Sequence, residues 1–113
     1  SEVCQLMEIL QITIRARDDK GDELLRTCQL IADQALQENG CTDSWLSQDD
    51  SNRDIFILEQ QWEHRSALNN YFRSDHFSAL IGAMKWLGQS YNIRINESSH
   101  EEGMDIVKRV RNI

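Results

Sequence analysis

The feature that most constrains the fold of this chain is a change in its hydrophobic period. Over residues 6–17 apolar side chains recur at every second position, which is typical of a strand with one buried face. Over residues 24–36 they recur at spacings of three and four, which predicts an amphipathic helix. The two periods then alternate along the rest of the chain, and the order in which they alternate limits the topologies that the chain can adopt. The buried face of the first strand is predicted to consist of Leu10, Ile12, Ile14 and Ala16.

A hairpin of two strands is predicted after the first helix. The range 41–48 carries Trp45, and the range 54–63 follows a stretch, 49–52, that has the composition of a turn. Asn39-Gly40 is expected to end the first helix, with Gly40 in a left-handed cap. The inner face of the third strand is predicted to carry Phe56, Leu58, Gln60 and Trp62.

Two short helices and a fourth strand are predicted next. The first helix holds Leu68 and Phe72, and Ser74 is placed to cap the second, whose apolar stripe begins at Phe77. Alternation over residues 91–96 indicates the fourth strand. Ser99 and Glu102 have the spacing of a capping box, so we expect a last helix over residues 101–113.

The predicted order is β-α-β-β-α-β followed by a C-terminal helix. This order is typical of a ferredoxin-like α+β fold, in which a four-stranded antiparallel sheet carries helices on one face. We assign residues 1–98 to this domain and residues 99–113 to a C-terminal helical extension of it. The uncovered sheet face should present Ile9, Trp45 or its neighbours, Ile55 and Ile57. An open apolar face favours a partner, so we predict a homodimer through this face.

Charge and cysteine content narrow the classes of partner. The 113 residues carry a net charge of −7, which argues against nucleic acid or an anionic membrane surface as partner. Cys4, Cys28 and Cys41 show no CxxC or Cys/His spacing, so we expect reduced thiols, no metal site and a cytoplasmic protein. No apolar run approaches the roughly 18 residues of a membrane span. The first four residues lack the basic region of a signal peptide.

Four short patterns resemble the antibiotic biosynthesis monooxygenase family. They are Glu38-Asn39-Gly40-Cys41, Ile57-Leu58-Glu59-Gln60-Gln61-Trp62-Glu63, Leu68-Asn69-Asn70-Tyr71 and Ser74-Asp75-His76-Phe77. Their order and spacing, on the predicted elements, match those of the family. The resemblance implies a dimeric α+β barrel, in which each subunit has a pocket between its sheet and its helices. It also implies oxidation of quinols or polycyclic aromatics by O2 without a metal or flavin cofactor.

The chain also departs from the family pattern at several positions. The family often has His where this chain has Tyr71, and usually has Glu where this chain has Gln60. A haem-degrading branch relies on an Asn, a Trp and a His. Ile14, Tyr71 and Ile81 occupy those places here, so the resemblance does not extend to haem degradation.

The family match suggests which residues could carry such chemistry. Cofactor-free oxygenation needs a base, a hydrogen-bond donor for the substrate anion, and walls that exclude bulk water. We assign His76 as the base and Tyr71 as the residue that orients a substrate oxygen. Trp62, Gln60 and Phe77 are assigned to substrate binding.

Structural roles are the main alternative for the same residues. His76 could cap its helix, and Tyr71 and Trp62 could be core aromatics. A buried Gln60 amide would need hydrogen-bond partners in either case. Two functions therefore stay open: a cofactor-independent monooxygenase for a quinol-like or fused-ring aromatic, and a non-enzymatic dimer that binds a small ligand or a protein partner.

Overall fold

The computed structural model describes residues 7–112, which form four strands and four helices. In chain order these elements are β1 (Glu8–Ala16), α1 (Gly21–Ala35), β2 (Cys41–Gln48), β3 (Ile55–Trp62), α2 (Arg65–Phe72), α3 (Asp75–Leu87), β4 (Gly88–Ile95) and α4 (His100–Arg111). This order confirms the predicted ferredoxin-like α+β arrangement. The predictions made for Cys4, for residue 6 and for residue 113 lie outside the described residues.

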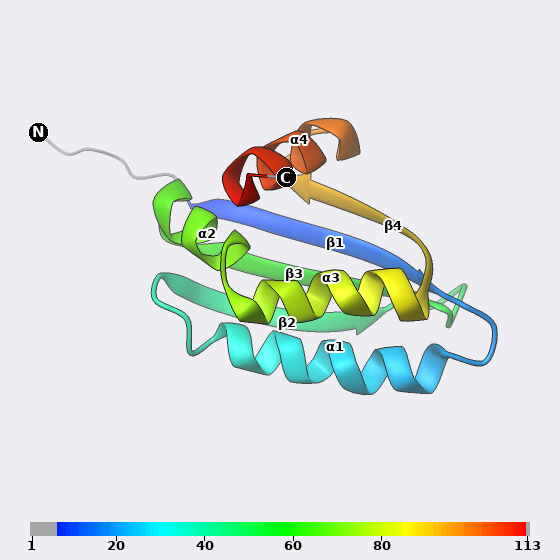
Figure 1. Ribbon diagram of the computed structural model, residues 1–113. Coiled ribbons are helices and arrows are strands. Elements are labelled where there is room, and N and C mark those ends of the chain that lie inside the picture. Colours follow the sequence, from blue (N-terminus) through cyan, green and yellow to red (C-terminus); the bar gives the residue numbers. More distant parts are fainter. Residues whose placement is uncertain (1–6, 113) are drawn as a thin grey trace, which may run out of the picture.

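The strands form one antiparallel sheet in the order β2-β3-β1-β4. At the centre, Ile12 of β1 pairs with Leu58 of β3 on one side and with Ile93 of β4 on the other. Helices α1 and α3 cover one face of this sheet, while α4 packs against β4 and the adjoining α2 (Figure 1). The hairpin β2–β3 is confirmed.

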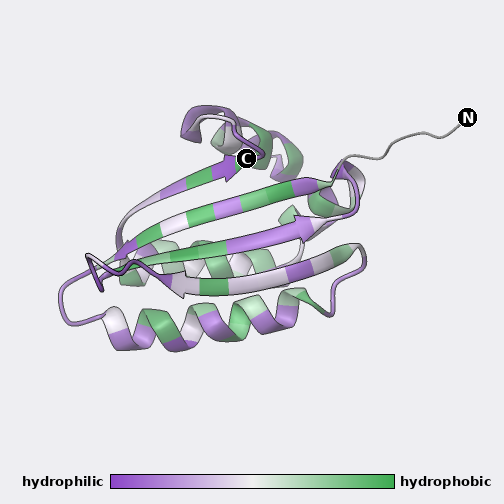
Figure 2. Ribbon diagram, turned by 180° about the vertical axis from the view of Figure 1, so that it is seen from behind, coloured by the Kyte–Doolittle hydropathy of each residue, from purple (hydrophilic) through white to green (hydrophobic). Residues whose placement is uncertain are grey.

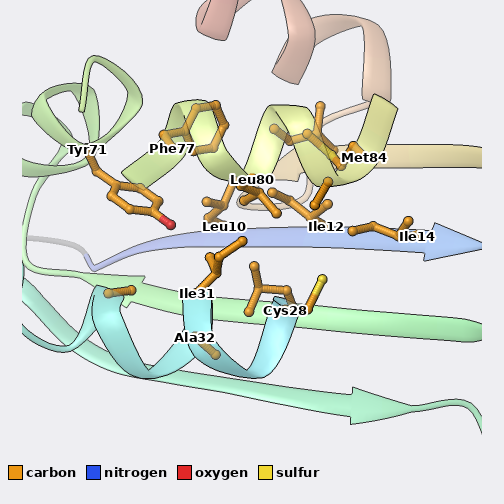
Figure 3. Packing of buried hydrophobic residues seen from close by; sticks show 14 of the residues in the cluster. Leu10, Ile12, Ile14, Cys28, Ile31, Ala32, Tyr71, Phe77, Leu80 and Met84 are labelled. Carbon is orange, nitrogen blue, oxygen red and sulfur yellow. The ribbon is translucent and has the colours of Figure 1, made fainter. Parts of the chain in front are cut away.

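The core lies between the sheet and the helices (Figure 3). Its sheet side is the face predicted for β1, since Leu10, Ile12 and Ile14 are all buried. Its helix side comes from the apolar stripes of α1 and α3, which meet the sheet through Cys28 and Leu80 among others. The buried face of the strands, which repeats with a period of two, thus faces the apolar stripes of the helices, which repeat with a period of 3.6, across one layer.

No helix of residues 7–112 covers the second sheet face (Figure 2). Ile9, Trp45, Ile55 and Ile57 are half-buried there, as expected from the alternation. Polar side chains stand between them, so hydrophobic and hydrophilic positions mix along the strands (Figure 2). The polar members of the two central strands of this face are Gln11, Thr13, Arg15, Glu59 and Gln61.

The end of α1 differs from the prediction. The helix ends at Ala35, and the chain then tightens into turns in which the amides of Gln37 and Glu38 bond carbonyls three residues back. Gly40 does have a left-handed φ of +89°, but it lies at the entry to β2 and does not cap the helix. A Cβ there would lie 2.5 Å from the Cβ of Ala67, so contact with α2 also demands glycine.

Two other details refine the predicted elements. Strand β4 begins at Gly88, three residues before the predicted start, because Gly88 pairs with Ala16 after a bulge in the register. The predicted caps are confirmed: the hydroxyl of Ser74 accepts a bond from the Phe77 amide, and that of Ser99 accepts one from the Glu102 amide. Within residues 7–112, no helix is both long and apolar enough to cross a membrane.

Candidate functional site

A chain of buried polar groups links β3 to α2. Gln60 and Trp62 are two residues apart on β3, so both side chains point into the core. The indole Nε1 of Trp62 donates to Oε1 of Gln60 over 3.2 Å. The amide Nε2 of Gln60 donates to the hydroxyl oxygen of Tyr71, also over 3.2 Å. The partners that a buried Gln60 was predicted to need are therefore these two aromatic side chains.

Aromatic rings pack around this polar chain. The Tyr71 ring lies 4.7 Å from Trp62 and 5.4 Å from Phe77, measured between centroids, and the contact with Phe77 is edge-to-face. Tyr71 points from α2 into the layer between helices and sheet (Figure 3). Burial raises the pKa of Tyr71 to about 12, although the bond from Gln60 opposes the shift. Tyr71 therefore stays a neutral phenol at physiological pH.

His76 lies at the surface, in the first turn of α3. About 45% of its side chain is exposed, and its Nδ1 lies 3.1 Å from Oε1 of Glu38. Ser74, and not His76, caps the helix. The structure thus places the predicted base beside a carboxylate, with its ring outside the apolar core.

A small hollow adjoins the buried polar chain. Its volume is about 90 Å³, which suffices for a few water molecules. Three of the residues that line it belong to the argument above: Trp62, Tyr71 and Glu38, the partner of His76. This hollow brings two predicted site residues together and places the carboxylate of the His76 pair beside them.

A larger cavity of about 290 Å³ lies between α3, β4 and α4. Its lining is mostly apolar: its two charged side chains are Lys85 of α3 and Lys108 of α4, and Tyr91 of β4 carries a hydroxyl. Of the residues predicted from the sequence to form the site, Phe77 lines this cavity, whereas His76, Tyr71, Trp62 and Gln60 do not. The other lining side chains are Ile81, Met84, Tyr91, Ile93, Met104 and Val107.

The sequence left two roles open for the apolar stripe of α4, which could cover the mouth of the pocket or contact a second subunit. The structure places Met104 and Val107 of this stripe in the lining of the cavity. Spacing alone could not decide between the two roles, because the packing of a terminal helix depends on tertiary contacts. One signal was available: the stripe of α3 extends through Ile81 and Met84, and the helix therefore has more apolar surface than the sheet edge alone covers.

The other two histidines have structural roles. Nδ1 of His64 caps α2 by accepting from the amide of Ala67 over 3.2 Å. Nδ1 of His100 accepts from the amide of Ile93 over 3.0 Å and so ties the start of α4 to β4. Among residues 7–112, no three His, Cys, Asp or Glu side chains gather closely enough to hold a metal ion.

The fold is shared with several solved structures. The protein PA3566 from Pseudomonas aeruginosa superposes with a TM-score of 0.75 at 23% identity, over 83% of this chain and 95% of that one. A conserved protein of unknown function from Bacteroides thetaiotaomicron gives 0.75 at 17% identity, over 81% and 97%. A candidate antibiotic biosynthesis monooxygenase from Nitrosomonas europaea gives 0.72 at 13% identity, over 87% and 95%. At these identities the likeness establishes the fold.

Sequence comparison establishes the family. The chain is 24% identical over 68 residues to the uncharacterised protein sll1783 of Synechocystis, a match that covers 60% of this chain and 46% of that protein. This chain therefore spans about half the length of that relative. The family model described as antibiotic biosynthesis monooxygenase matches residues 7–83, well over half of the chain. The chain therefore belongs to the antibiotic biosynthesis monooxygenase family.

Proposed function

We propose that this protein is a cofactor-independent monooxygenase that binds a small apolar ring compound between α3, β4 and α4. The observation that carries the proposal is the apolar cavity of about 290 Å³. An apolar cavity of about 150 Å³ takes up benzene, so there is room here for roughly two fused rings. Family membership supports oxidation as the reaction.

The reaction asks little of the protein. A quinol-like or anthrone-like ring loses a proton, and the resulting anion passes an electron to O2. When the ring CH2 of an anthrone becomes a ketone, or a quinol becomes a hydroxyquinone, O2 supplies the new oxygen atom and leaves its second atom as water. The substrate is the only electron donor. The cavity would contribute position and dry walls, which the lining by Phe77, Met84 and Val107 supports.

The second candidate function is non-enzymatic binding of the same class of ligand. It is favoured by one observation: among the described residues, no carboxylate or imidazole lines the large cavity. The hydroxyl of Tyr71 is engaged by Gln60, and the imidazole of His76 is engaged by Glu38. A protein of this kind would bind the ring without a dedicated base.

A different location within the enzyme hypothesis keeps the residues predicted from the sequence. The hollow of about 90 Å³ adjoins Trp62, Tyr71 and the carboxylate of Glu38. His76, paired with Glu38, is the proposed base in this version, and Tyr71 the proposed hydrogen-bonding residue. A ring compound would enter only if α2 moved, because the hollow holds little more than water.

Oxygen uptake separates these alternatives. The purified protein would be assayed with hydroquinones, anthrones and flavonols. We expect saturable uptake that Val107→Phe abolishes by filling the large cavity, and that Leu30→Phe, on the exposed side of α1, leaves unchanged. Loss of uptake in His76→Ala and Tyr71→Phe, but not in Val107→Phe, would move the site to the small hollow. Ring binding with no uptake above the uncatalysed rate would establish the non-enzymatic function.

We further propose a homodimer that forms through the open sheet face. Ile9, Trp45, Ile55 and Ile57 support it, because they are half-buried apolar side chains on a face that no helix covers (Figure 2). Light scattering after size exclusion would give twice the mass of one chain. Ile57→Asp should produce monomers, whereas Leu30→Asp, on α1 at the opposite side of the molecule, should not.

We also propose that the protein works in a reducing compartment such as the cytoplasm. The thiols of Cys28 and Cys41 are both free. Burial raises the pKa of the Cys28 thiol to about 12 and that of Cys41 to about 11, so both resist oxidation as neutral thiols. Mass spectrometry of protein isolated under alkylating conditions would test their redox state.

A further inference from the structure

Two lysines line the large cavity, and they come from different helices. Lys85 belongs to α3 and Lys108 to α4. Neither forms an ion pair with a carboxylate among residues 7–112. Asp105 precedes Lys108 by one turn of α4, yet the two side chains do not pair. The Lys85 ammonium lies instead 5.4 Å from the centre of the Trp86 ring.

Two lysines and no carboxylate of the described residues line this cavity, although the chain as a whole has 19 acidic and only 12 basic residues. The lysines also lie at a mostly apolar surface, where an anion without a cation nearby would be poorly solvated. A ligand with an apolar body and one anionic edge matches both features of this cavity.

The absence of a base from the cavity lining also favours an anionic ligand. No carboxylate or imidazole of the described residues lines the cavity, so nothing there is suited to remove a proton from a neutral ligand at physiological pH. A ligand that arrives already ionised binds as an anion without such a group, and only its oxidation still requires the loss of a ring proton. An ammonium group near a weakly acidic ligand also lowers the pKa of that ligand, which favours the ionised form.

We propose that the ligand is a small bicyclic aromatic acid, bound as its anion. Its rings fill the space between Phe77, Met84 and Val107, and its anionic oxygen lies at the exposed edge of the cavity, toward the side chains of Lys85 and Lys108. This assignment rests on the proposed function, because it uses the same cavity. It adds the substrate class and the two residues that select it.

This selectivity belongs to the part of the chain outside the family match. The family model ends at residue 83, inside α3, and both lysines come after it. Met104 and Val107 of α4 also lie beyond residue 83. We therefore assign the ligand preference of this chain to the last turn of α3 together with α4, which lies in the predicted C-terminal extension at residues 99–113.

Calorimetric titration with a matched pair of ligands tests the proposal. The pair is 2-naphthoate and 2-naphthalenemethanol, which share the ring system and differ in charge. We expect roughly tenfold tighter binding of the anion, since each partly exposed ion pair contributes up to about fivefold. Raising the NaCl concentration from a low to a high value should weaken binding of naphthoate only. A naphthol titrated across its ionisation would show whether a phenolate substitutes for the carboxylate.

Variants assign the effect to the lysines. Lys85→Met and Lys108→Met keep the unbranched apolar stem and remove the charge, so each should cut the preference for the anion several-fold without changing binding of the alcohol. Lys20→Met, beside α1 and away from the cavity, is the matched control and should keep the preference.

Three results would overturn the inference, and they differ in what they leave standing. Equal binding of the two ligands would refute the anionic class but keep the cavity as a ring-binding site. An anion preference that survives both Lys→Met changes would refute the assignment to Lys85 and Lys108. Failure of either ligand to bind, in protein shown to be folded by circular dichroism, would remove the proposed function of the cavity as well.

Discussion

Two regions of the layer between the sheet and the helices are built differently, although Phe77 contacts both. In the region beneath α2, which we call the filled end, Trp62, Gln60 and Tyr71 are linked by hydrogen bonds among packed aromatic rings, beside a hollow of only about 90 Å³. In the region beneath α4, which we call the hollow end, mostly apolar side chains surround a cavity of about 290 Å³ with two lysines in its lining. In the filled end the buried polar side chains form hydrogen bonds with one another. The hollow end contains empty space, and its two lysines form no ion pair with a described carboxylate.

This difference separates stability from binding within one small domain. A buried amide with two hydrogen-bond partners fixes the packing around it, because moving either partner away would leave a buried polar group without a hydrogen bond. A cavity costs stability, since its lining loses contacts on one side. The filled end therefore stabilises the fold, and the hollow end is where a ligand gains contacts. The family match covers the whole polar chain and stops before most of the cavity lining.

Truncation of Trp62 should produce the largest effect. Trp62 is fully buried, and Trp62→Ala removes its ring stacking and its bond to Gln60, so we expect a loss of about 3–5 kcal/mol in the free energy of unfolding. Urea unfolding followed by circular dichroism measures it. Trp86→Ala is the matched control, because Trp86 is 70% exposed and should cost less than about 0.5 kcal/mol. Similar losses in both variants would contradict the picture of a tightly filled end.

Replacement of Gln60 tests the polar chain itself. Gln60→Leu conserves bulk but leaves the Trp62 indole and the Tyr71 hydroxyl without a partner, so we expect a loss of about 1–3 kcal/mol. Gln29→Leu, on the exposed side of α1, should change stability by less than about 0.5 kcal/mol. If Gln60→Leu were as stable as the wild type, the hydrogen bonds at this end would not matter to its rigidity.

The same contrast explains what the sequence could and could not predict. Alternation along β1 and β3 predicted which residues face the core, because a strand places every second side chain on one face. It also predicted that Gln60 would be buried and would need partners. Spacing could not reveal that Tyr71 from α2 would be one of them, since that contact depends on how α2 packs against β3.

The cavity was harder to predict for a related reason. A cavity is the space left after packing, and no local pattern encodes it. Lys85 and Lys108 lie 23 positions apart in the sequence, and only the docking of α4 brings both into one lining. The exposure of Leu25 and Leu36 was also missed: both belong to the apolar periodicity over residues 24–36, yet both are exposed, and Leu36 follows the last residue of α1.

Alkaline pH should weaken the filled end through Tyr71. Burial raises its pKa from 10.0 to about 12, so between these values the unfolded chain releases a proton that the folded chain keeps. The unfolded state then binds fewer protons, and the free energy of unfolding falls by up to about 1.4 kcal/mol per pH unit. Tyr71→Phe should make this fall shallower. Tyr91→Phe, at the cavity, should retain the steeper fall because Tyr71 is intact. Denaturant titrations from pH 9 to 12 measure the slopes.

The smallest effect concerns the attachment of α4 at the hollow end. Arg111 donates to the carbonyl of Phe72 and, over 2.9 Å, to the hydroxyl of Ser78, which holds the end of α4 against α2 and α3. Arg111→Met should cost about 1 kcal/mol, and hydrogen exchange should quicken in the amides of α4 but not in those of β3.

Arg109→Met is the matched control for Arg111→Met, because both changes remove a cation from the last turn of α4 and so lose the same favourable interaction with the helix dipole. Arg109 has no hydrogen bond to α2 or α3 among the described contacts. If exchange in α4 quickened equally in the two variants, the dipole and not the contacts of Arg111 would hold the helix. If exchange quickened in β3 as well, the two ends of the layer would open together, and the division between a stabilising end and a binding end would fail.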